Sequence, residues 1–207
     1  MTFPTPDPAY QPVPAGLTET VVPVTGNADP APNRASVLIV PFLIGAAVTV
    51  LLGVYGSLHE PTGIAVSIAG FSGPLAVKVW LATVAVVLAV VQLFSALAMY
   101  GKLGFEAPTW TGRLHRWSGR LAFLFAVPVA IHCLYAVGFQ PGTPRLLIHS
   151  LLGCFFFGAF TVKMLILPRK GVPGWALPVF GGLVFTGLVG LWLTSSLWFF
   201  TTFGVKF

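Results

Sequence analysis

Residues 35–57 read ASVLIVPFLIGAAVTVLLGVYGS, and this run contains no charged side chain. An α-helix rises about 1.5 Å per residue, so a run of this length crosses the roughly 30 Å hydrocarbon core of a bilayer. Four more apolar runs follow, at about residues 75–101, 118–139, 146–167 and 175–201. Segments rich in Gly and Pro separate them. The sequence therefore predicts an all-α fold, a polytopic membrane helix bundle with five transmembrane helices over residues 35–207.

The composition excludes an ordinary soluble domain. Hydrophobic residues make up 56% of the 207 positions and charged residues only 8%, whereas soluble domains carry about 25% charged residues. The formal net charge is +6, but the basic residues gather at the ends of apolar runs instead of forming a stripe. This distribution argues against nucleic acid as a partner and favours the lipid bilayer.

The basic residues also predict the orientation of the chain. One predicted side of the membrane receives Arg34, Lys102, Arg113, Arg116, Arg120, Arg169 and Lys170, and the other receives Arg145 and Lys206. Cytoplasmic loops carry the excess of Lys and Arg. We therefore predict a multi-pass protein of the cell membrane with its N-terminus in the cytoplasm and its C-terminus outside.

Residues 1–34 differ in composition from the rest of the chain. They hold eight of the 18 prolines and few large apolar side chains, without periodicity. Such a segment buries too little apolar surface to offset the entropy lost on ordering. We predict a disordered, Pro-rich cytoplasmic tail ahead of the transmembrane domain.

Two of the four histidines, His132 and His149, fall inside predicted spans, where a polar side chain is costly and usually functional. Each lies roughly 5–10 Å below the outer boundary, by the rise per residue. The link at residues 140–144 is short, so spans three and four should be antiparallel neighbours. Two imidazoles at one depth on adjacent helices suit the two axial positions of a haem iron. A hydrogen-bonding role between helices is the alternative for each.

The other two histidines, His59 and His115, are weaker candidates for haem ligands. His59 stands just past span one, beside Glu60 and Pro61, and is either an interfacial loop residue or a ligand or proton-handling group. His115 lies 17 residues before His132, about 25 Å along a helix, so the two cannot share one metal. It is either an interfacial anchor or a ligand of a second haem with Met99 or Met164.

The stretch His115-Arg116-Trp117-Ser118-Gly119-Arg120-Leu121-Ala122, followed by His132 in the same span, resembles cytochrome b561-like and ferric-reductase-like transmembrane haem domains. Residues 147–153 resemble the ligand helix that comes next in them. Together with residues 78–83 and Gln92, this part of the chain also resembles a family of uncharacterised bacterial five-span membrane proteins. The resemblance implies a b-type haem protein with His132 and His149 as ligands. Because Lys163 occupies the position where a second haem's ligand would lie on span four, we expect one haem.

These observations favour electron transfer over other functions. We expect one bis-His haem b near the outer face, exchanging electrons with quinol or an extracytoplasmic redox protein. The chain would then be an oxidoreductase component without a catalytic domain of its own, since no nucleophile elbow, P-loop or carboxylate pair is present. The alternatives are a cofactor-free accessory or scaffold subunit of a larger membrane complex and, less favoured, a small metal permease using His59, His132 and His149.

Overall fold

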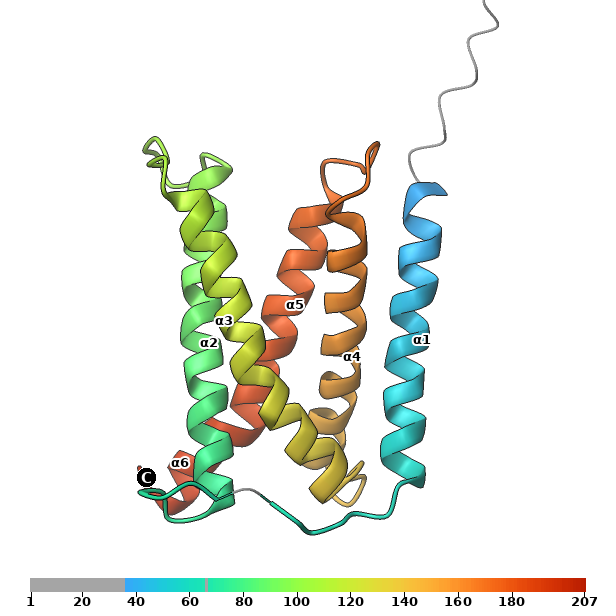
Figure 1. The fold of residues 1–207 in the computed structure, drawn as a ribbon, viewed down its shortest axis with the longest axis vertical. Coiled ribbons are helices and arrows are strands. Elements are labelled where there is room, and N and C mark those ends of the chain that lie inside the picture. Colours follow the sequence, from blue (N-terminus) through green and yellow to red (C-terminus); the bar gives the residue numbers. More distant parts are fainter. Residues whose placement is uncertain (1–35, 66) are drawn as a thin grey trace, which may run out of the picture. The chain divides into compact units, whose positions relative to one another are not determined.

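The computed structural model describes residues 36–65 and 67–207, and this part of the chain is helical with no strand. The elements are α1 (Ser36–Leu58), α2 (Pro74–Met99), α3 (Thr111–Ile131), the π-helix η1 (His132–Val137), α4 (Pro144–Ile166), α5 (Ala176–Trp192), the π-helix η2 (Leu193–Leu197) and α6 (Trp198–Phe203) (Figure 1). Within the described residues, five helical segments are long and apolar enough to span a membrane. The predicted all-α, five-span architecture is confirmed. The predicted tail, residues 1–34, lies outside the described residues.

Span three begins earlier than its apolar run. The sequence predicts a start near Ser118, whereas α3 begins at Thr111. The difference arises because the first turns carry His115 and three arginines, and these residues lower hydropathy without opposing a helix. The same span changes from α to π geometry at His132, one turn beyond Pro128. Pro128 has no backbone N–H, so it weakens the regular hydrogen-bond ladder just before that change.

The helices pack in a defined set of pairs. Within the described residues, α2 packs along α3, α1 along α4, and α5 against both α4 and α2. The α1–α4 contact depends on small residues, because Gly45 and Gly158 face each other across it. Ala85, Ala89, Phe156 and Leu188 form a buried cluster where α2, α4 and α5 meet.

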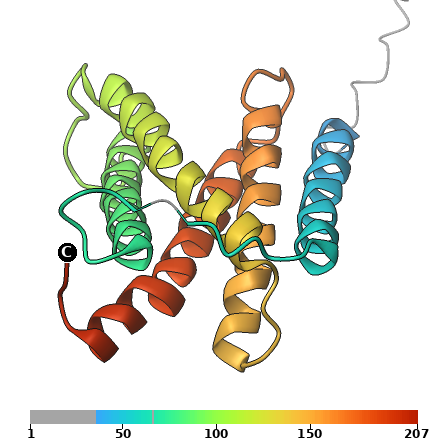
Figure 2. The same ribbon diagram turned by 60° about the horizontal axis from the view of Figure 1, so that its bottom comes forward.

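Helices α3 and α4 are not among the closely packed pairs of the described residues. Joined by the short link that follows η1, they diverge away from it (Figures 1 and 2). This differs from the expectation that the short link makes them packed neighbours. A short link fixes only the linked ends of two helices, and here side chains of both line a cavity.

Candidate functional site

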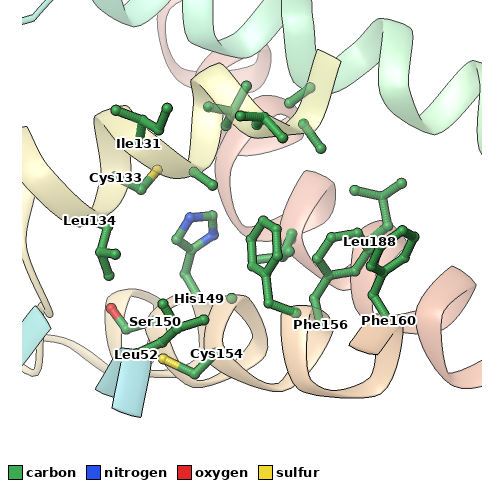
Figure 3. A pocket seen from close by; sticks show the side chains of 18 of the residues that line it. Leu52, Ile131, Cys133, Leu134, His149, Ser150, Cys154, Phe156, Phe160 and Leu188 are labelled. Atoms are coloured by element: carbon green, nitrogen blue, oxygen red, sulfur yellow. The ribbon is translucent and has the colours of Figure 1, made fainter. Parts of the chain in front are cut away.

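A cavity of about 650 Å³ lies among the five spans. Every span contributes side chains to its wall, from Leu52 on α1 to Trp192 on α5. The wall is mostly apolar, with aromatic rings at Phe123, Phe156, Phe157 and Phe160. Figure 3 shows these surroundings, with α4 below and α3 and η1 above. We call this space the large cavity.

His149 is the only histidine that lines the large cavity, among the residues that the structure describes. It is half-buried on α4, and its ring extends into the open space (Figure 3). Its Nδ1 lies 2.9 Å from Thr194 Oγ1 on η2. Span five therefore fixes the orientation of an imidazole that span four supplies.

The hydrogen bonds of Thr194 are compatible with the metal-binding tautomer of His149. The Thr194 hydroxyl lies 2.8 Å from the Gly190 carbonyl and 3.1 Å from the Leu191 carbonyl. When the hydroxyl donates to one of these carbonyls, its oxygen accepts the hydrogen on Nδ1 of His149, and the neutral ring keeps its lone pair on Nε2. This is the state in which histidine binds metals, with the other ring nitrogen held by a hydrogen bond.

Arg145 ties the same two elements together. Its guanidinium donates to the Thr194 carbonyl at 2.7 Å and lies over the Trp198 ring, 3.9 Å from the centroid. Arg145 stands one turn before His149 on α4, and Thr194 belongs to the π-helical η2. Local π geometry is frequent at functional sites. Thr194 therefore contacts α4 twice: its hydroxyl contacts His149, and its backbone carbonyl accepts the hydrogen bond from Arg145.

His132 faces a different space. It lines a second pocket of about 300 Å³, together with Lys78, Tyr135 and apolar residues of α2 and α3, and it does not line the large cavity. The two spaces share Lys78, Val129 and Ile131 as lining residues. We call the second space the small pocket. The structure thus places His132 and His149 in neighbouring compartments, and it does not bring the two rings together in one cavity.

His59 lies in the loop after α1, sandwiched between two tyrosines. Its ring stacks on Tyr55 and Tyr135, with centroid distances of 5.0 Å and 4.7 Å. Its Nε2 lies 3.2 Å from the Tyr135 carbonyl, to which it donates. It lines neither the large cavity nor the small pocket. These contacts favour the reading of His59 as a loop residue over the reading as a ligand.

His115 belongs to a polar cluster between α2 and α3. Its Nδ1 lies 2.9 Å from Ser95 Oγ, and Gln92 donates to its carbonyl and, at 3.3 Å, to Ser118 Oγ. Ser95 and Ser118 are buried. His115 lines neither of the two spaces, whereas Met164, one of its suggested partners, lines the large cavity. The contacts of His115 are those of a residue that joins two helices.

Comparison with known proteins places the chain in a family. The DUF6529 profile, described as a family of unknown function, matches residues 38–207. The chain belongs to this family. The matched region holds the five spans, except for the first two residues of α1, and the lining of the large cavity and the small pocket. No curated protein and no solved structure matches this DUF6529 chain.

Sequence reasoning missed two residues of the DUF6529 site. Span five, residues 175–201, carries no titratable side chain, yet its Thr194 holds the ring of His149. The signal was the polar run Thr194-Ser195-Ser196 within an apolar span. The second residue is Lys78, which lines both the large cavity and the small pocket.

Proposed function

We propose that this protein is a membrane electron-transfer protein that holds one b-type haem in the large cavity, with His149 as an axial ligand. One observation carries the proposal. An imidazole whose Nδ1 lies 2.9 Å from the Thr194 hydroxyl lines a large, mostly apolar cavity. A bound haem supplies a one-electron couple, and the protein sets its properties through ligands, hydrogen bonds and burial.

The residues of the large cavity fit such a group. Its volume of about 650 Å³ lies within the range of small-molecule and cofactor sites, roughly 300–1,000 Å³. Four phenylalanines offer flat apolar surface. Lys78 also lines the cavity and is the one Lys or Arg side chain among the described lining residues.

The proposal depends on His149 and leaves the second axial position open. The sequence predicts His132 as the second axial ligand, whereas in the structure His132 lines the small pocket. The bis-imidazole form therefore stays a prediction, which the His132 variants described below decide. Without haem, the remaining candidate is an accessory subunit of a larger membrane complex.

A visible absorption spectrum tests the proposal directly. Protein purified from haem-replete cells is expected to show a Soret band and, after reduction with dithionite, a sharp α band of the b type. Added haemin should restore both bands in any preparation that lost cofactor during purification. A colourless preparation that also fails to bind added haemin would contradict the proposal and favour the accessory subunit.

The orientation of the bundle determines which partners reach the site. The links α2–α3 and α4–α5 carry Lys102, Arg169 and Lys170, and the link α3–α4 leads into Arg145 on α4. By the excess of basic residues, we place the first two links in the cytoplasm and His149 toward the outer face. Quinol or an extracytoplasmic redox protein is then the electron partner.

Alkaline phosphatase fused after Phe207 should be active, whereas a fusion within the α2–α3 link should be inactive. The reverse pattern would invert the orientation.

Removing the Thr194 hydroxyl is expected to weaken haem binding. Thr194→Val keeps the shape of the side chain but leaves Nδ1 of His149 without its acceptor. Loss of such a supporting hydrogen bond typically costs about 10–100-fold in metal affinity. Haem titration should therefore show weaker binding and a shifted reduction potential in Thr194→Val, and near-normal values in Thr194→Ser.

Thr201→Val is the matched control for this change. Thr201 lies in the same span on α6, exposed, and its hydroxyl donates to the Leu197 carbonyl at 2.9 Å. It lines neither the large cavity nor the small pocket. Haem affinity should not change in this variant. Equal affinities in Thr194→Val and the wild type would remove Thr194 from the site.

A further inference from the structure

The small pocket combines two polar side chains with mostly apolar walls. His132 and Lys78 line it, and neither side chain makes a hydrogen bond or ion pair with another described residue. No acidic side chain lines it, among the residues described. The remaining wall is mostly apolar and includes Ile64, Leu81 and Pro128. The pocket therefore offers two hydrogen-bond donors and otherwise apolar surface.

The backbone beside the pocket is held in place by η1. The loop after α1 donates two backbone hydrogen bonds to it, from Thr62 to the Tyr135 carbonyl and from Gly63 to the Ala136 carbonyl, each 3.2 Å long. These bonds use carbonyls from the last turn of the helix, which have no partner within it. They anchor the loop just before Ile64, so the chain there forms a fixed part of the pocket wall.

The pocket has an apolar rim toward the surface of the bundle. Ile64, Ile68 and Ile131 line it with exposed fractions of 80%, 48% and 60%. Ile64 and Ile68 belong to the loop between α1 and α2, whereas Ile131 lies on α3 within span three, where an exposed apolar side chain meets lipid. A ligand with a long hydrocarbon tail can therefore leave the tail in the bilayer while its head occupies the pocket.

These features restrict the chemistry of the ligand. A head with acceptor oxygens at its edges and apolar faces satisfies His132 and Lys78 without placing oxygens against the apolar wall. A phospholipid phosphate carries oxygens on every side, and burying polar atoms against apolar surface is costly. We propose that the small pocket binds the ring of a membrane quinone, with His132 and Lys78 donating to its carbonyl oxygens. The choice of a redox-active ring depends on the proposed haem in the adjacent large cavity.

Binding of decylubiquinone and menadione to the purified full-length protein tests the inference, with dissociation constants measured by calorimetric titration. Saturable binding of one of the two probes is expected. His132→Ala and Lys78→Met should each weaken it about 5- to 10-fold, as expected for one lost hydrogen bond. His132→Gln, which keeps an N–H donor, should bind more tightly than His132→Ala. Lys102→Met is the matched control, because Lys102 is exposed and lines neither space, and its affinity should equal that of the wild type.

Haem spectra recorded on the same samples separate this inference from the proposed function. Retained b-type bands in His132→Ala, together with weaker quinone binding, support the small-pocket site. Loss of the bands in His132→Ala overturns it and assigns His132 to the iron. Two further results also overturn it: unchanged quinone affinity in both pocket variants, or equal competition by dihexanoylphosphatidylglycerol. Quinone binding by a protein that is colourless and binds no added haemin would support the small-pocket site and contradict the haem proposal alone.

Discussion

Replacing His149 with alanine is expected to abolish the b-type absorbance. His149 is the only histidine lining the large cavity among the described residues, and its Nδ1 lies 2.9 Å from the Thr194 hydroxyl. Alanine removes the only imidazole that lines that cavity among the described residues. The ratio of Soret to protein absorbance, with a pyridine haemochrome assay for total haem, should fall at least about 10-fold.

Added imidazole distinguishes loss of the ligand from loss of the fold. His149→Ala leaves a space where the ring stood, beside the Thr194 hydroxyl that held its Nδ1. Free imidazole added with haemin should restore much of the Soret band if the rest of the cavity is intact. His59→Ala and His115→Ala serve as comparisons, since neither residue lines the cavity, and both should keep the wild-type bands. A His149→Ala protein with full haem content would exclude His149 as the ligand.

The fold could be predicted because the chain separates its charges from its apolar runs so sharply. Five runs lack the charge needed to solvate a surface, and α-helices satisfy their own backbone groups in lipid. The observed segments, such as Ser36–Leu58 and Pro144–Ile166, lie within a few residues of those expected. Span three is the exception at its start, since hydropathy does not register a helix whose first turns are basic.

The site could be predicted only in part, because sequence gives distance along a helix more reliably than direction around it. The rise per residue predicts similar depths for His132 and His149. It does not predict which compartment each ring faces. His132 is the first residue of a π-helix, where the 3.6-residue period no longer applies. The structure places this ring in the small pocket and His149 in the large cavity.

The divergence of α3 and α4 has a related physical cause. Their link is short, but α3 has its main contact with α2, and α4 with α1 and α5. Close contacts with these other helices hold α3 and α4 apart beyond the link, and the large cavity lies between their side chains. Link length alone contains no information on those competing contacts. The contact between α1 and α4 therefore helps to determine the shape of the large cavity.

Filling the α1–α4 contact is expected to destabilise the protein. A Cβ on Gly158 would lie 2.6 Å from the Gly45 carbonyl oxygen and would also collide with the Thr49 side chain. The carbonyl belongs to a helix backbone, so Gly158→Ala must push α1 and α4 apart. Overpacking of this kind typically costs about 1–3 kcal/mol. We expect a thermal midpoint in detergent that is roughly 2–10 °C lower.

Gly182→Ala is the matched control, and its effect should have the opposite sign. Gly182 is exposed on α5, and a Cβ there would meet nothing within 4 Å. Alanine in a helix interior is favoured over glycine by about 0.5–1 kcal/mol. The midpoint should therefore rise slightly in Gly182→Ala.

Because Val48 and Leu52 of α1 line the large cavity, haem affinity should fall in Gly158→Ala and stay unchanged in Gly182→Ala. Equal midpoints for the two variants would show that α1 and α4 do not make the close contact described above.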